Sequence, residues 1–312
     1  MTSVTTVVPA RTGLVGHPSD AFGGAVLAMP VPALAATVTV AASPDVRVGD
    51  RHFAELEALL AAPHEGDSML LTATAAGLVT WLRDRGLRPP SAEFTMTWST
   101  TIPRSVGLAG SSALVIGALR SLARFWEVDI ADDVGPQLAL DVEVEGLGIA
   151  AGPQDRIVQW HNAPLLMDFA STPWALTEIH PPTPMELLVV WTDAARQPSQ
   201  TTHAPLQQRR DDNDVVLHIH ALGELARRAA AALTAGAVDE FARLVDEGFE
   251  HRRALLALDP AHVELVEELR RLGAAATYTG SGGAVVALAA DLDQLRDWAR
   301  KRGLGTAVAT LA

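Results

Sequence analysis

The stretch Ile102-Pro-Arg-Ser-Val-Gly-Leu-Ala-Gly-Ser-Ser-Ala113 decides how the rest of the chain is interpreted. It follows residues 93–98, where polar and apolar residues alternate as in a strand, and it runs into residues 114–125, which have helical spacing. A strand, a loop of small residues and a helix start are the layout of an anion site, because glycine permits close approach and the first helical N–H groups lack partners. An isolated Gly-Ser-Ser is also a common helix cap, so the assignment needs support from elsewhere in the chain.

The composition is that of a soluble globular protein. The 312 residues are 48% hydrophobic and 20% charged, which suits one large or two mid-sized domains. A net charge of −13 without a basic stripe argues against a nucleic-acid partner. The chain has no cysteine, no pattern of a signal peptide and no uncharged apolar run of membrane-spanning length. We therefore expect a cytoplasmic protein without a membrane partner, and the sequence does not indicate its oligomeric state.

The single lysine of the chain limits how it could bind phosphate. Lys301 lies near the C-terminus and belongs to no Gly-Lys-Ser or Gly-Lys-Thr sequence, which excludes a lysine-containing P-loop. Phosphate would have to be bound by backbone N–H groups, arginine and a metal ion.

The remaining pattern predicts strands and helices in a mixed order. Strands are expected at residues 4–16, 25–29, 33–40, 165–169, 185–191, 284–289 and 305–310, and helices at 55–62, 68–84, 134–145, 215–235, 237–256, 262–272 and 292–302. Residues 156–161 fit a helical turn or a helix. A proline cluster at 181–184 predicts a boundary between domains 1–180 and 181–312.

Three loops rich in glycine and serine, at residues 13–24, 105–113 and 279–283, occur in an informative order. Ala10-Arg-x-Gly-Leu-x-Gly16, Pro103-x-x-x-Gly-Leu-Ala-Gly-Ser-Ser-Ala113 and Tyr278-Thr-Gly-Ser-Gly-Gly283 resemble the three signature motifs of the GHMP small-molecule kinase superfamily. The resemblance implies a two-domain α+β fold. Its N-terminal domain would be a ribosomal-protein-S5-like α/β domain and its C-terminal domain a ferredoxin-like α+β domain.

The same resemblance implies ATP and Mg²⁺ as cofactors. The ATP phosphates would bind at Pro103, Gly107, Leu108, Ala109, Gly110, Ser111, Ser112 and Ala113, where Ala109 is an extra residue relative to the family pattern. A hydroxyl and a carboxylate are suitable hard ligands for Mg²⁺, and we assign Ser112 and Glu143 to it. Glu143 lies twelve residues before Asp155, as in galactokinase-like members. Glu145 is the alternative ligand, and Glu143 could instead lie on a solvated helix face.

The resemblance also implies two catalytic residues. Asp155 matches the aspartate base of the Gly-x-x-Asp segment and would accept the proton of the acceptor hydroxyl or orient that hydroxyl. Arg11 matches the arginine of the first motif, which would balance charge near that aspartate and the transferred phosphoryl group. The alternative for Asp155 is a helix cap.

Within the superfamily, four stretches resemble the glucuronokinases: Gly16-His-Pro-Ser-Asp20, residues 103–112, Ala151-Gly-Pro-Gln-Asp-Arg156, and Pro198–His203 followed by Arg209-Arg210. The resemblance implies phosphorylation of the anomeric hydroxyl of a uronic acid, D-glucuronate, to the 1-phosphate. The implied substrate-binding residues are His17, Ser19, Asp20, Gln154, Arg156, His203, Gly280, Ser281 and Gly282. The glycines would also let the third loop pack behind the phosphate loop.

Several alternatives stay open at this point. Another substrate (a heptose phosphate, galacturonate or a neutral hexose) is possible, as is a catalytically silent sensor that binds ATP or sugar. Asp20 could form an Asx-turn, and His203 could be a lid residue or an ordinary surface histidine. A uronate carboxylate would need a guanidinium partner, for which the candidates are Arg104, Arg156 and Arg209. Two tryptophans, Trp81 and Trp98, could border adenine but more simply belong to the core.

Overall fold

The computed structural model describes residues 3–90, 93–192 and 206–312. These residues form two compact units. The described residues of unit 1 are 3–9, 35–90, 93–102 and 110–161, and those of unit 2 are 10–34, 103–109, 162–192 and 206–312. Two long strands, β1 (Ser3–Val15) and β2 (Ala25–Ala42), contribute residues to both units. The division at residue 180 expected from the sequence stays a prediction.

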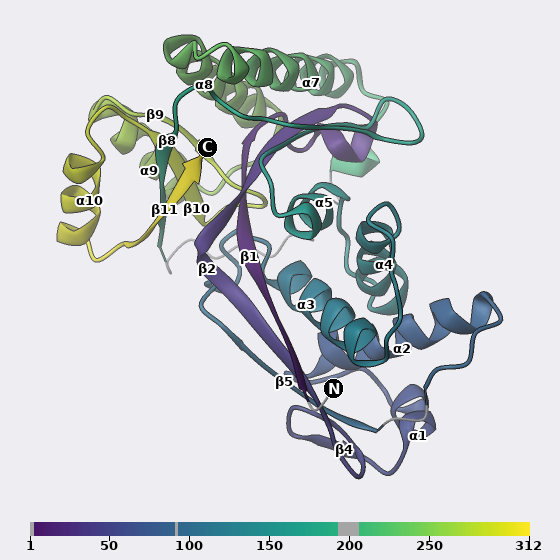
Figure 1. Ribbon diagram of the computed structural model, residues 1–312. Coiled ribbons are helices and arrows are strands. Elements are labelled where there is room, and N and C mark those ends of the chain that lie inside the picture. Colours follow the sequence, from purple (N-terminus) through teal and green to yellow (C-terminus); the bar gives the residue numbers. More distant parts are fainter. Residues whose placement is uncertain (1–2, 91–92, 193–205) are drawn as a thin grey trace. The chain divides into compact units, whose positions relative to one another are not determined.

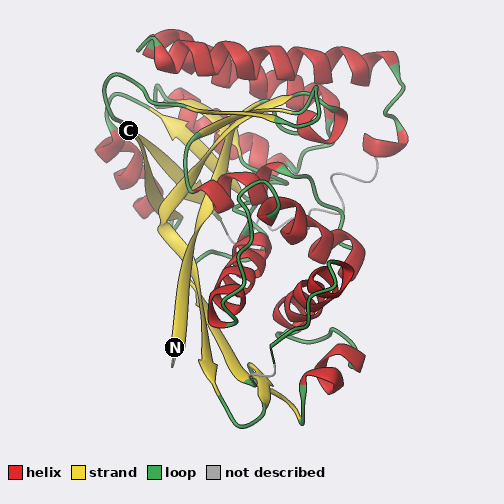
Figure 2. Ribbon diagram, turned by 45° about the vertical axis from the view of Figure 1, so that its right-hand side comes forward, coloured by secondary structure: helices red, strands yellow, loops and turns green. Residues whose placement is uncertain are grey.

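In unit 1, the strands lie on one side of a group of helices (Figures 1 and 2). Residues 36–42 of β2 pair antiparallel with β5 (Phe94–Thr100), which pairs parallel with β3 (Val46–Val48), and β3 pairs with β4 (Arg51–Phe53). The helices are α1 (Leu56–Ala61), α2 (Met69–Asp84), α3 (Gly110–Phe125), α4 (Gly135–Asp141), the π-helical turn η2 (Val142–Gly146) and α5 (Gln154–His161). Buried apolar side chains of α2 and α3 supply much of the core.

Unit 2 is built on a four-stranded antiparallel sheet with the order β11-β8-β10-β9. Its strands are β8 (Met185–Trp191), β9 (Ala275–Tyr278), β10 (Ala284–Leu288) and β11 (Gly305–Leu311), and β6 (Leu165–Asp168) with β7 (Ala175–Glu178) adds to residues 25–28 of β2. The helices are η1 (Ser19–Phe22), α7 (Asn213–Thr234), α8 (Val238–Leu255), α9 (Pro260–Arg271) and α10 (Leu292–Lys301). Helices α7 and α8 lie side by side (Figure 1). Within the described ranges, no helix is both long and apolar enough to cross a membrane.

The α+β class expected from the sequence is confirmed, and the structure adds three short strands, β3, β4 and β7, that the sequence pattern does not predict. Residues 25–42 form one strand rather than two. Pro30 and Pro32 lie between the part of β2 that pairs with β6 and the part that pairs with β5, so their missing N–H groups interrupt neither ladder. The helix expected at 134–145 ends at Asp141 and continues as the wider turn η2, which carries Glu143 and Glu145.

A pair of histidines joins α7 to α8. The Nδ1 atoms of His218 and His251 lie 2.9 Å apart, and both rings are half-buried. One ring must donate and the other accept, so the contact requires at least one neutral imidazole. Burial and the neighbouring His218 lower the pKa of His251, while Glu247 opposes the shift.

This pair predicts a pH-dependent stability. A histidine whose pKa is lower in the folded than in the unfolded state gives stability that is present above its unfolded pKa, about 6.5, and is lost as the pH falls below that value. We expect the melting temperature of the protein to fall between pH 7 and pH 5.5, and to fall less in His251→Gln, in calorimetry at matched ionic strength. His220→Gln, which changes an exposed histidine of α7, the helix that carries His218, is the control and should keep the wild-type profile. Parallel profiles for the wild type and His251→Gln would contradict the assignment.

Candidate functional site

The loop Pro103–Ala109 leads from β5 directly into α3 and has an unusual backbone. Ser105, Gly107 and Ala109 all have positive φ angles, of 59°, 74° and 59°. For the two non-glycine residues this left-handed conformation is uncommon and mildly strained. Helix α3 begins at Gly110, so the N–H groups of its first turn have no partner within the helix. This is the local structure that the sequence predicts for a phosphate loop, and the binding of ATP to these residues stays a prediction.

The carbonyl of Gly107 is the point where all three glycine-rich motifs meet. Its oxygen accepts hydrogen bonds from Nη1 of Arg11 at 2.9 Å and from the hydroxyl of Thr279 at 2.5 Å. The backbones are in contact as well, because a Cβ built on Gly107 would lie 2.3 Å from the Thr279 carbonyl oxygen and one on Gly280 would lie 2.6 Å from the Gly107 oxygen. The third loop therefore does pack against the phosphate loop, as expected from its glycines. Arg11 supports that loop in addition to its predicted catalytic role.

Arg252 of α8 holds the third loop from the other side, and sequence reasoning missed it. Its guanidinium donates to the carbonyl of Gly280 at 2.8 Å and to that of Tyr278, and it lies 3.4 Å from the centre of the Tyr278 ring. The Tyr278 ring also stacks with the ring of His262, with 6.3 Å between the ring centroids and an interplanar angle of 9°. Burial lowers the pKa of Arg252, and the charge of Asp20 acts in the opposite direction. Arg252 could have been identified in the sequence as a basic residue on the apolar face of α8, the face that also carries Phe249 and Leu255.

The first motif continues into a buried loop around η1. His17, Ser19 and Asp20 are all buried, and Nδ1 of His17 lies 3.5 Å from a carboxylate oxygen of Asp20. The hydroxyl of Ser19 donates to the carbonyl of Ala25 at 2.8 Å, so this side chain is used within the loop. The roles of these three residues in substrate binding stay predictions.

Helix α5 and the turn η2 bring two predicted carboxylates to one arginine. Arg156 is buried and donates through Nε and Nη2 to one oxygen of Glu143, at 2.8 Å for Nε, while its Nη1 lies 3.7 Å from Asp155 and 2.8 Å from the Gly152 carbonyl. Glu143 is fully buried, and within the described part of the chain its second oxygen, Oε1, has no hydrogen-bond partner. Glu145 is exposed, and the choice of Glu143 over Glu145 as a metal ligand stays a prediction.

Ser112, the other predicted metal ligand, is fully buried in the first turn of α3. Its hydroxyl donates to the side-chain oxygen of Gln159 on α5 at 2.7 Å. Ser111, in contrast, is exposed. Sequence reasoning did not find Gln159, because its partners are 47 and 150 residues away.

The other predicted residues are placed as follows. Gln154 and Ser281 are buried, and Arg104 and Arg209 are exposed, with Arg209 in ion pairs to Asp212 and Asp214. His203 lies outside the described residues. Trp98 is half-buried against Gly49, and Trp81 lies under the guanidinium of Arg85 at 4.2 Å. These contacts suit structural roles for both rings.

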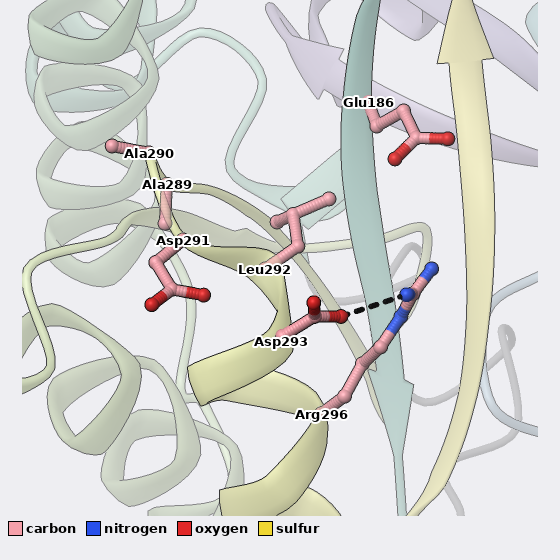
Figure 3. Close-up of a pocket in the computed structure, with 7 residues that line it drawn as sticks. All are labelled: Glu186, Ala289, Ala290, Asp291, Leu292, Asp293 and Arg296. Atoms are coloured by element: carbon pink, nitrogen blue, oxygen red, sulfur yellow. Dashed lines mark hydrogen bonds and ion pairs between the residues drawn. The ribbon is translucent and has the colours of Figure 1, made fainter.

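A hollow of about 410 Å³ lies in unit 2, beside the start of α10 (Figure 3). Its lining consists of Glu186, Ala289, Ala290, Asp291, Leu292, Asp293 and Arg296. It contains none of the residues predicted from the motifs, and its Asp293–Arg296 pair, at 3.1 Å, is solvent-exposed. We assign no function to it.

The junction at Gly107 predicts a large effect of adding one methyl group. Gly107→Ala would place its Cβ 2.3 Å from the Thr279 oxygen in a left-handed conformation, so we expect the free energy of unfolding to fall by about 2–4 kcal/mol in urea titrations. Gly86→Ala is the matched control. Gly86 has a similar φ of 70° but nothing within 4 Å of the added Cβ, so only the conformational cost of about 1 kcal/mol should remain. Equal losses in the two variants would contradict the close approach.

Comparison with known proteins agrees with this arrangement of motifs. The model for the GHMP kinases N terminal domain matches residues 73–162, and the model for the GHMP kinases C terminal region matches residues 229–306. Glucuronokinase 1 of Arabidopsis thaliana is 30% identical over 299 residues, which cover 89% of this chain and 82% of the plant protein.

Solved structures share the fold over the full length. Streptococcus pneumoniae phosphomevalonate kinase in complex with phosphomevalonate and AMPPNP superposes with a TM-score of 0.81 at 17% identity, covering 98% of this chain and 100% of that one. Lactococcus lactis galactokinase complexed with galactose gives 0.78 at 16% identity, covering 99% and 92%. With both family models matched and a relative aligned over most of its length, the chain belongs to the GHMP family of ATP-dependent small-molecule kinases.

Proposed function

We propose that this chain is a uronate kinase that transfers the γ-phosphoryl group of ATP to the anomeric hydroxyl of D-glucuronate. The observation that carries the proposal is the 30% identity to an Arabidopsis thaliana glucuronokinase along 82% of that protein. Family membership supplies the reaction class, and this relative supplies the substrate. The predicted catalytic residues Asp155 and Arg11 are both present in the chain, which argues against a silent sensor.

Asp155 is the proposed base. Phosphoryl transfer needs an oriented acceptor hydroxyl and charge neutralisation on the phosphates rather than a strong covalent catalyst. The Asp155 carboxylate is half-buried at the start of α5, close to the guanidinium of Arg156. A carboxylate fixed in this way can orient the sugar hydroxyl and accept its proton as the phosphoryl group is transferred. The loop 103–109 and the first turn of α3 would bind the ATP phosphates through backbone N–H groups.

The residues present fit a magnesium ion. The Oε1 atom of Glu143 is buried without a hydrogen-bond partner in the described ranges, and the buried Ser112 hydroxyl, which donates to Gln159, is the second oxygen that we propose for the ion. Ser112 and Glu143 would hold Mg²⁺, which when bound neutralises charge on the ATP phosphates. No cluster of three or more His, Cys, Asp or Glu side chains suited to a metal occurs among the described residues.

The uronate carboxylate needs a cationic partner. Arg156 is already engaged with Glu143, which argues against this role for it. Arg104 in the phosphate loop and Arg209 are the exposed candidates. Arg209 is in ion pairs with Asp212 and Asp214, but these pairs are solvent-exposed and therefore weak, unlike the buried pair of Arg156 with Glu143. The buried His17–Asp20 pair would contact the sugar hydroxyls, because a carboxylate can accept hydrogen bonds from two neighbouring hydroxyls.

An assay of ADP release with a panel of acceptors tests the proposal. With Mg²⁺ and ATP we expect turnover with D-glucuronate that exceeds turnover with galacturonate, galactose, homoserine and mevalonate. Good turnover with a neutral sugar and none with either uronate would overturn the uronate assignment.

The same assay includes Asp155→Asn as an internal control. This variant keeps the shape of the side chain but removes its charge and most of its basicity, so we expect kcat to fall by about two to four orders of magnitude. ATP binding, measured by calorimetry with AMPPNP, should change little. Wild-type turnover in Asp155→Asn would remove the base role and leave the kinase assignment standing.

A further inference from the structure

The third loop depends on support from its surroundings, because it is rich in glycine. Gly280, Gly282 and Gly283 all have positive φ angles, of 50°, 115° and 101°. Glycine loses more backbone freedom on folding than any other residue, so fixing a loop of such positions is costly. Arg252 of α8 supplies support, because its guanidinium donates to the carbonyls of Tyr278 and Gly280, the latter at 2.8 Å.

The two carbonyls held by Arg252 belong to the residues on either side of Thr279. A guanidinium is planar and presents its donors in a fixed fork, so it fixes the two carbonyls relative to each other. Thr279 is fully buried, and its hydroxyl donates to the carbonyl of Gly107 at 2.5 Å. A side chain of α8 therefore helps to set the place where Thr279 meets the phosphate loop.

The phosphate loop needs contacts of this kind. Ser105 and Ala109 have φ angles of 59°, a conformation that non-glycine residues keep only where the surrounding structure enforces it. Residues 103–109, Thr279 and Arg252 all belong to unit 2. We propose that Arg252 is a positioning residue for nucleotide binding, which keeps residues 103–109 in shape for the ATP phosphates through Thr279. The inference rests on the ATP site of the proposed function, and it assigns Arg252 no contact with ATP.

Two competing explanations lead to different results. In the first, Arg252 only stabilises the packing of α8, and its loss lowers stability without a selective effect on nucleotide binding. In the second, the charge of Arg252 acts on Asp20, a predicted sugar-binding residue with which it interacts electrostatically. Loss of Arg252 would then weaken the binding of the sugar rather than of ATP.

Arg270 of α9 provides a matched control. Its guanidinium lies over the ring of Phe249, at 4.7 Å from the ring centre, and its Nη2 donates to the carbonyl of Asp246 at 3.0 Å. Arg270 thus combines an aromatic ring with a backbone carbonyl, as Arg252 does, and both of these partners belong to α8. Within the described part of the chain, the hydrogen bonds of Arg270 go to α8 and not to the third loop.

The test measures the Kd of AMPPNP by calorimetry, with the melting temperature followed in parallel. In Arg252→Met we expect the Kd to rise about ten-fold, because hydrogen bonds from a charged donor are among the stronger ones. Arg252→Lys keeps the charge but replaces the planar fork with one ammonium group, so the Kd should still rise several-fold. Arg270→Met should lose stability and keep the wild-type Kd.

A wild-type Kd in either Arg252 variant, or an equal rise in Arg270→Met, would overturn the inference. If Arg252→Met does not fold, Arg252→Lys carries the test. Steady-state kinetics then separate ATP from the sugar: Arg252→Lys should raise the KM for ATP and leave the KM for the sugar within about two-fold of the wild type. The reverse pattern would assign Arg252 to Asp20 and overturn its role at the phosphate loop.

A double-mutant cycle decides whether Arg252 acts through Thr279. Thr279→Val removes the hydroxyl at similar size and should itself weaken AMPPNP binding. Adding Thr279→Val to Arg252→Lys should cause a smaller loss than adding it to the wild type, and simple addition of the two effects would overturn this inference alone. If the wild type binds no AMPPNP, the ATP site of the proposed function fails, and this inference fails with it.

Discussion

The contact between the Gly107 carbonyl and the hydroxyl of Thr279 is the constraint on which the rest of the site depends. It joins segments 172 residues apart, and Arg11 reaches the same oxygen from 96 residues away. Contacts this distant in sequence cost chain entropy to form, so they persist only where the surrounding structure supports them.

Two buried arginines, one in each unit, each hold a different segment in place. Arg252 holds the third loop through two carbonyls and an aromatic ring, and Arg156 holds Glu143 through a buried ion pair. Burying a charge costs free energy unless the charge is hydrogen-bonded or paired. Even a paired buried arginine therefore adds little to the free energy of unfolding, so stabilising the fold is a weak explanation for these two residues. Both arginines contact segments that the motifs mark as functional. We interpret them as groups that keep a loop and a carboxylate in fixed positions.

The fold class and the motif loops could be predicted from the sequence, because they depend on local properties. Periodicity indicates strands and helices, and glycine indicates close backbone approach, as the contact of Gly107 with Gly280 shows. The partners of buried polar side chains could not be predicted, since Gln159 reaches Pro9 across 150 residues. Glu143 also depends on a π-helical turn that its sequence spacing does not reveal.

The most direct test of the account is a crystal structure of the full chain with AMPPNP, Mg²⁺ and D-glucuronate. The account predicts nucleotide phosphates on residues 103–113, a metal ion contacting Ser112 and Glu143, and the anomeric hydroxyl between Asp155 and the γ-phosphate. Phosphates bound away from this loop, or a sugar with a different hydroxyl facing the γ-phosphate, would contradict it.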